Sequence, residues 1–320
     1  MRWAILTASL LLVSSASGGT TGGTPVALVT AEQQNMLFAV VLPSGKVRRR
    51  VRLPADPQNV AVGPTRMAVV VSPRAGAVTL VDARTLKIVK VFRGFGSPHL
   101  AAIHPSGTWA YVTDDARGVL TVIDLEQRRI VDRIYVGSGA HHLAVGPNGH
   151  RLWIALGEHA REIAIVGLSD PSRPRLLRRF SPGFIAHDLT FGPQGRVWVT
   201  SDVGDSVYVL SARTGVSVFR IRVGAGPQHV AFSVCGAVKC GAAFITSGYS
   251  NRLVKVDPRT GRIIASAETP HGSFNLSSIG GLVVTTSLLT GQVTEFNLKL
   301  HRLASVKPAS AARGVALTVW

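Results

Sequence analysis

Many sequence features that identify enzymes and membrane proteins are missing from this 320-residue chain. It contains no glycine-rich phosphate loop and no dinucleotide-binding motif, and helical periodicity is essentially absent. The turn Gly137-Ser138-Gly139 lacks the strand-to-helix context in which a nucleophilic serine is found. These absences remove nucleotide-dependent enzymes and serine hydrolases from the classes of function that the sequence supports.

The chain also lacks an apolar run long enough to cross a membrane. Its N-terminal run, Ala4–Val13, is far shorter than the roughly 20 residues that a bilayer core of about 30 Å requires. Arg2 precedes this run and the small residues Ser14–Gly19 follow it, which is the pattern of a secretory signal peptide over residues 1–18. No cysteine follows the run, so a lipid anchor is not expected. We therefore expect a periplasmic or secreted protein with no transmembrane segment.

Cysteine is scarce, with only Cys235 and Cys240 in the whole chain. In an exported protein, two cysteines five positions apart predict a small disulfide that staples a turn. A thiolate metal site would need a second pair of cysteines, which the sequence does not have.

Acidic residues are few as well, with 17 Asp and Glu against 35 Lys and Arg, and the formal net charge is +18. Such a charge attracts anionic partners, including wall polymers, lipid head groups and nucleic acid. The basic residues are mostly arginines dispersed over outer strands and turns, and no aromatic ladder alternates with them as in proteins that bind single strands. We interpret them as a solvated, arginine-rich surface and expect no specific nucleic-acid partner.

What the chain does contain is a repeat of short β-strands. Residues 111–149 hold four runs rich in β-branched side chains, separated by clusters of turn formers. The same unit recurs with a period of 40–50 residues, which is typical of a β-propeller. Its copies cover residues 25–53 with 311–320, 57–93, 97–136, 139–180, 184–223, 226–268 and 270–307, and they form one domain over residues 25–320.

The two ends of the repeat array complement each other. The chain ends with an inner strand, Val315–Leu317, that has no strands after it, while the first copy starts at a second strand, from Val26. Together they complete one blade, and this closes the ring and removes exposed sheet edges. The predicted fold is therefore all-β: a seven-bladed β-propeller of four-stranded antiparallel blades, closed by the C-terminal strand joining the N-terminal blade.

The segments Tyr111–Asp114, Leu120–Asp124 and Leu143–Gly149 resemble the YVTN repeat family, whose units read YVTN, then TVSVID, then VGxxPxGVAVSPDG. The resemblance covers essentially the whole chain after the signal peptide and implies the propeller fold. Asp114 stands where the family has asparagine. The family and its lactonase-like and lyase-like relatives include both binding proteins and enzymes, so the resemblance does not decide the activity.

One position of the repeat is rich in polar side chains, namely the residues just before each inner strand. Because the inner strand begins on the face where the second strand ends, these residues should rim the axial channel on that face. Five of the ten histidines fall at or beside this position. The predicted ligand-binding residues are Gln58, His99, His141, His142, His187, Asp188, Gln228, His229, His271 and Arg313.

The loops after the second strands add carboxylates to the same face, namely Glu32, Asp115, Glu158 and Asp202. Neutral imidazoles beside carboxylates suit zinc, copper or another divalent metal ion, and we take His141, His187 and His229 as candidate ligands. The same groups suit acid–base chemistry near neutral pH. A third interpretation is that the histidines only hydrogen-bond loop carbonyls of neighbouring blades.

The leading hypothesis is an exported, monomeric propeller that acts as a binding or interaction module through its histidine-lined face. Its partner would be a small molecule, a cell-envelope component or a protein, with a divalent metal ion as the cofactor to test. The alternative is a metal-dependent lyase or lactonase-like enzyme, because Leu152–Ala155 and Gly195–Thr200 also resemble virginiamycin B lyase-type propellers. That resemblance implies His187, His229 and His271 as bases and Glu158 or Glu268 as their partner.

Overall fold

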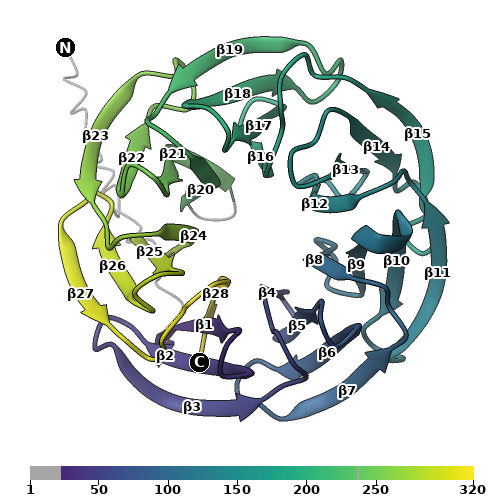
Figure 1. Cartoon of the computed structure of the whole chain (residues 1–320), viewed down its shortest axis with the longest axis horizontal. Coiled ribbons are helices and arrows are strands. Elements are labelled where there is room, and N and C mark those ends of the chain that lie inside the picture. Colours follow the sequence, from purple (N-terminus) through teal and green to yellow (C-terminus); the bar gives the residue numbers. More distant parts are fainter. Residues whose placement is uncertain (1–22, 236–237) are drawn as a thin grey trace, which may run out of the picture.

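The computed structural model describes residues 23–235 and 238–320, without the side chains of residues 234–240. It consists of seven four-stranded antiparallel sheets arranged as blades around a central axis (Figure 1). The one helical element among the described residues is a single 3-10 turn, η1 (Asp115–Arg117). The predicted seven-bladed propeller is confirmed.

Each blade runs from an innermost to an outermost strand. Blade 1 contains β28 (Val315–Val319), β1 (Pro25–Ala31), β2 (Met36–Val41) and β3 (Lys46–Arg52). Blade 2 contains β4 (Asn59–Val62), β5 (Met67–Ser72), β6 (Ala77–Asp82) and β7 (Ile88–Arg93). Blade 3 contains β8 (Pro98–Ile103), β9 (Trp109–Asp114), β10 (Val119–Asp124) and β11 (Arg129–Tyr135).

The remaining four blades have the same strand order. Blade 4 contains β12 (Ala140–Val145), β13 (Arg151–Leu156), β14 (Ile163–Gly167) and β15 (Arg175–Phe180). Blade 5 contains β16 (Leu189–Gly192), β17 (Arg196–Ser201), β18 (Ser206–Ser211) and β19 (Ser217–Arg222). Blade 6 contains β20 (Pro227–Cys235), β21 (Val238–Ser247), β22 (Arg252–Val256) and β23 (Ile263–Glu268), and blade 7 contains β24 (Ser273–Ile279), β25 (Leu282–Ser287), β26 (Val293–Asn297) and β27 (Arg302–Val306).

The core is divided among the interfaces between blades. The second and third strands are buried on both faces because a neighbouring blade covers each face, and this explains their nearly continuous apolar runs. Tyr111 and Leu120 of blade 3, for example, pack with Leu152 and Ile154 of blade 4. The outer strands are largely exposed, and all four arginines of β3 are exposed to solvent.

The ring closes as predicted. Strand β28 pairs antiparallel with β1, with Val315 opposite Val29 and Val319 opposite Pro25. The final residue extends the closure into blade 2, because the Nε1 of Trp320 donates a hydrogen bond to the Ala83 carbonyl at 2.9 Å. The inner strand of blade 1 is thus supplied by the other end of the chain.

Two predictions concern parts of the chain outside the described structure. The signal peptide over residues 1–18 precedes the first described residue. The disulfide between Cys235 and Cys240 depends on side chains in the stretch that is not described, although the backbone of β20 and β21 continues as a hairpin with Cys235 opposite Val238. Both stay predictions. Within the described residues, no helix is both long enough and apolar enough to cross a membrane.

Candidate functional site

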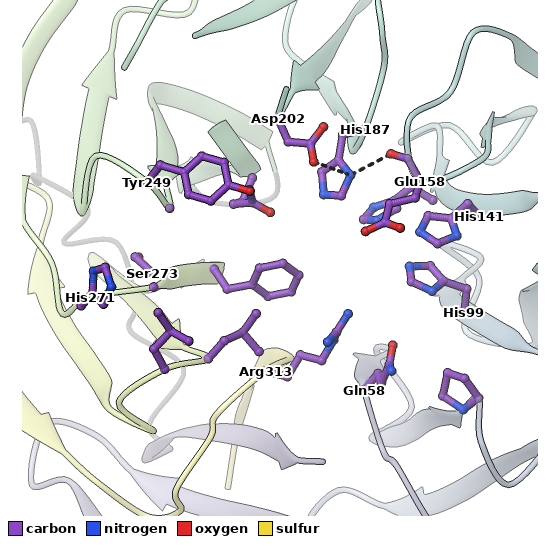
Figure 2. A pocket seen from close by; sticks show the side chains of 18 of the residues that line it. Gln58, His99, His141, Glu158, His187, Asp202, Tyr249, His271, Ser273 and Arg313 are labelled. Atoms are coloured by element: carbon purple, nitrogen blue, oxygen red, sulfur yellow. Dashed lines mark hydrogen bonds and ion pairs between the residues drawn. The ribbon is translucent and has the colours of Figure 1, made fainter. Parts of the chain in front are cut away.

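A cavity of about 670 Å³ opens at the propeller axis, on the face where the second strands end. Figure 2 shows His99, His141, His187 and Glu158 on one side of it, with Tyr249, His271 and Ser273 on the opposite side. A smaller cavity of about 240 Å³ is lined by residues in or next to the inner strands, including Asp188 and His229. The candidate site therefore lies in the axial channel, at the face where the second strands end.

Bulges in the inner strands present the site residues to the channel. In blade 4, Ala140 and Leu143 of β12 lie opposite Leu156 and Ile154 of β13, so His141 and His142 together face one residue. The inner strands of blades 3, 6 and 7 have the same irregularity. A bulge gives a strand an extra residue and re-aims its side chains, and here it brings two consecutive side chains toward the axis.

A repeated threonine near the end of the second strand holds the backbone at this position of the repeat. Its hydroxyl donates to the carbonyl of the residue at the equivalent position of the next blade at 2.5–2.9 Å, and accepts an N–H from a residue in or just before its own inner strand at 2.8–3.3 Å. The threonines are Thr30, Thr113, Thr200, Thr246 and Thr286. The threonine of the Tyr-Val-Thr-like strand therefore ties five of the seven blades to the next one at the site.

Five buried imidazoles lie side by side along this channel. The rings of His99 and His141 stack with centroids 3.4 Å apart, and His142 lies 5.0 Å from each of them. His142 also lies 4.4 Å from His187 and 5.5 Å from His229. The histidines of blades 3 to 6 thus form one contiguous cluster.

Carboxylates accept hydrogen bonds from the Nδ1 atoms of three of these rings. Asp188 accepts from His142 at 3.0 Å and from His229 at 3.1 Å, one ring on each oxygen, and Asp115 accepts from His141 at 2.9 Å. An ionised carboxylate can only accept, so each of these Nδ1 atoms carries a proton. The neutral ring then keeps its lone pair on Nε2, which is the arrangement of histidines that bind metal ions.

The buried environment favours the neutral rings. Burial and the neighbouring histidines lower the pKa values of His99 and His142 well below the ordinary range, and that of His187 is lowered for the same reasons. Burial opposes ionisation of Asp188, but His229 and the hydrogen bond from His142 outweigh it and lower the pKa of this carboxyl overall. The Nε2 atoms of His99, His187 and His229 are buried without a hydrogen-bond partner.

Two groups of three residues are compact enough to share an ion. The ligand atoms of His99, His141 and His142 all lie within 4.8 Å of one another, and so do those of His142, Asp188 and His229. His142, which the proposed set of His141, His187 and His229 omits, belongs to both groups. Both oxygens of Asp188 already accept from imidazoles. The triad of His99, His141 and His142 is therefore the better candidate, because it does not need the occupied oxygens of Asp188.

The other residues predicted from the sequence surround this cluster. Gln58, Gln228, His271 and Arg313 line the cavity with Glu158 and Asp202, whereas Glu32 pairs with Arg313 at 3.0 Å. His187 approaches the Glu158 carbonyl at 3.2 Å and Asp202 at 3.8 Å (Figure 2). His271 is exposed and contacts Asn251 at 3.1 Å. Glu268, the other carboxylate considered for a lyase, is exposed at the end of outer strand β23.

Sequence reasoning missed the apolar part of the cavity. In blade 7 the bulge residues are Phe274 and Asn275, whereas the histidine column suggested a place near His271. Tyr249, Leu288 and Leu289 complete this wall from the loops after the second strands. The position of Thr286 is the signal that would have placed Phe274, because Thr113 and Thr246 lie opposite the corresponding bulges in blades 3 and 6.

Comparisons with known proteins give the fold and a partial family match. Residues 62–160, less than half of the chain, match the family model of the cytochrome D1 heme domain. This segment includes His99, His141 and His142. A comparison with curated protein sequences found no match.

Several solved structures are similar in fold to nearly the whole length of this chain. A functionally unknown protein from Desulfotomaculum acetoxidans is 13% identical, with a TM-score of 0.79 over 91% of this chain and 98% of that one. Apo AztD from Citrobacter koseri is 10% identical, with a TM-score of 0.73 over 93% and 98%. Dihydro-heme d1 dehydrogenase NirN, in complex with DHE, is 16% identical, with a TM-score of 0.66 over 89% of this chain and 64% of that one. At such identities the likeness shows the fold alone.

Proposed function

We propose that this protein is an exported, monomeric binding module that holds a divalent transition-metal ion in its axial imidazole cluster. The observation that carries the proposal is the set of five buried imidazoles, three of which have their Nδ1 atoms held by carboxylates. Since neutral imidazole is a preferred ligand of zinc and copper, these metals are the best candidates. A buried cation would also compensate the charges of Asp188 and Asp115.

His99, His141 and His142 are the residues that we expect to bind the ion. Three imidazole ligands leave a fourth position of a tetrahedral ion open to water or to a further ligand. Asp115 and Asp188 would fix the orientation of the His141 and His142 rings, as carboxylates do behind metal-bound histidines elsewhere.

The experiment is to measure the metal content of the purified chain and its affinity for zinc and copper by competition with a fluorescent chelator. We expect about one ion per chain, lost in the double variant His141→Ala/His142→Ala and kept in His150→Ala, whose side chain is exposed. If no metal binds, and no metal changes the melting temperature of the wild-type chain, the proposal is wrong.

A tetrapyrrole is a second candidate, favoured by the match to the cytochrome D1 heme domain over a segment that contains three of the five imidazoles. The buried Nε2 of His99 and the guanidinium of Arg313 are groups that suit an iron ion and a carboxylate, respectively. Titration with haemin tests this candidate: a shifted Soret band that disappears in His99→Ala/His141→Ala supports it, and free-haemin spectra throughout exclude it.

The metal-dependent lyase or lactonase stays the enzymatic alternative. Glu158 lines the cavity next to His187 and contributes a carboxylate that can exchange protons with a bound substrate. Incubating the zinc-loaded protein with a panel of lactones, beside Glu158→Gln, tests this. Turnover that this variant abolishes supports an enzyme, and no turnover with any lactone favours the binding module.

A further inference from the structure

The cavity has two chemically different walls. The imidazoles of blades 3 to 5 line it together with an apolar set from blades 6 and 7, namely Phe274, Leu288, Leu289 and Tyr249. Figure 2 shows Tyr249 across the cavity from His99, His141 and His187. Tyr249 is 76% exposed and Leu289 is 64% exposed, although both are large apolar side chains at the mouth of a cavity. Exposed apolar side chains clustered at a concave site mark surfaces that bind ligands.

Arg313 lies between these walls and points into the cavity (Figure 2). One guanidinium nitrogen donates to Glu32 at 3.0 Å, and the group lies over the Phe274 ring at 5.1 Å from its centroid. Its Nε is buried without a hydrogen-bond partner. A guanidinium that is held in place and still has free donors is suited to a carboxylate, which accepts two parallel N–H bonds.

The cavity is much larger than an ion needs. An ion with six waters occupies about 200 Å³, at about 30 Å³ per water, whereas this cavity has about 670 Å³. The volume lies in the range of about 300–1,000 Å³ that is typical of small-molecule sites. A bare ion at the imidazole wall would leave the apolar wall and Arg313 without a ligand.

We propose that the cavity binds the metal ion as a complex with a small aromatic chelator that carries a carboxylate. The imidazoles bind the metal, the aromatic body of the chelator packs on Tyr249 and Phe274, and its carboxylate pairs with Arg313. An ion held by three imidazoles has an open fourth position and can expand to five-coordinate, so it would accept the two donor atoms of the chelator. This inference rests on the proposed function, since it needs the imidazole cluster to bind metal.

The test compares zinc alone with two zinc complexes that differ in one carboxylate, those of 8-hydroxyquinoline and of 8-hydroxyquinoline-5-carboxylate. Binding is followed by calorimetry and by the fluorescence of the complexes. We expect the carboxylate complex to bind at least tenfold more tightly than either zinc alone or the neutral complex. Free 8-hydroxyquinoline-5-carboxylate without zinc should bind at least tenfold more weakly than its complex.

Variants separate the parts of the site. Arg313→Gln should remove the tighter binding of the carboxylate complex and leave the affinity for zinc alone unchanged. The control Arg222→Gln, at an exposed arginine outside the cavity, should leave the affinities for zinc and for both complexes unchanged. Tyr249→Ala should weaken both complexes without affecting zinc. Because Tyr249 is 76% exposed, this variant tests the apolar wall even if loss of the pair between Arg313 and Glu32 destabilises the fold.

The outcomes distinguish this inference from the proposed function. Zinc binding without any gain from the chelators overturns the inference and leaves the proposed function standing. No binding of zinc or of either complex overturns both. Equal binding of the chelator with and without zinc overturns the inference, and the binding of zinc alone then decides the proposed function. Haemin binding that depends on His141, without binding of the small complexes, assigns the cavity to a tetrapyrrole and overturns the inference.

Discussion

Replacing Asp188 by asparagine should weaken metal binding without removing any metal ligand of the favoured triad. The carboxylate accepts Nδ1–H bonds from His142 at 3.0 Å and from His229 at 3.1 Å, one on each oxygen. An asparagine of the same shape has one acceptor oxygen and one NH₂ donor. In Asp188→Asn one of the two rings therefore meets a donor and has to present an unprotonated Nδ1, which moves its proton to Nε2.

The size of the loss in metal affinity depends on which of the two rings changes its tautomer. If it is His142, a ligand of the favoured triad no longer offers its Nε2 lone pair. Loss of a carboxylate behind a metal-bound histidine costs about 10- to 100-fold in metal affinity, which is about 1.4–2.7 kcal/mol. Loss of the negative charge acts in the same direction, because Asp188 is buried beside the cluster and is held ionised.

The assay is competition of the purified variant against a fluorescent zinc chelator at pH 7.4, together with a thermal melt that reports folding. Asp205→Asn serves as the matched control, since Asp205 lies in the same blade and its side chain is 53% exposed. Its affinity should stay within about twofold of wild type. A folded Asp188→Asn protein with wild-type affinity for zinc would refute the expectation that the asparagine changes the tautomer of His142.

Three further predictions concern stability. Zinc at about 100 times its dissociation constant should raise the free energy of unfolding by about 2.7 kcal/mol, and EDTA should reverse this in a denaturant titration. Thr113→Val removes the bonds to the Leu100 N–H and the His141 carbonyl and should cost about 2 kcal/mol in the same titration, whereas Thr121→Val, at a buried hydroxyl without a partner, should be neutral or stabilising. Burial raises the pKa of Glu295, whose oxygens have no partner, so the folded state keeps this proton longer than the unfolded state. Wild-type stability should therefore decline as pH rises from about 4.5 through the folded-state pKa; Glu295→Leu should remove this decline and add about 1–3 kcal/mol at pH 7, and a pH-independent gain or loss would contradict the assignment.

The fold was readable from the sequence because seven copies of one pattern support each other. A strand that is ambiguous alone, such as Val78–Val81, becomes clear when the same run follows a Tyr-Val-Thr-like strand in other copies. Ring closure was predictable as well, because an unaccompanied C-terminal strand and an N-terminal copy without an inner strand fit together. Both inferences use only order along the chain, which a repeat makes visible.

The site was only partly predictable, because contacts between blades are not encoded in spacing. The histidine column could be read from the repeat, but the pairing of Asp188 with both His142 and His229 depends on how blades 4, 5 and 6 meet at the axis. The apolar wall was hidden for a different reason. The inner strand of blade 7 departs from the repeat pattern, so Phe274 could not be aligned with the histidines that it faces, including His229 at 4.9 Å.

The threonine contacts also bear on whether the histidines act only as turn residues. In that role the imidazoles would donate hydrogen bonds to loop carbonyls. The carbonyl of His141, however, accepts from the Thr113 hydroxyl, and that of Gln228 accepts from the Thr200 hydroxyl. Among the described contacts of the five buried rings, only His187 meets a loop carbonyl, while three others bond to carboxylates. The backbone of the bulge is thus held by a residue other than histidine. Because the equivalent position, whose carbonyl also accepts from a threonine, carries Phe274 in blade 7 and Arg313 in blade 1, the fold does not need an imidazole there, and this favours the proposed ligand site over a turn role for the histidines of blades 3 to 6.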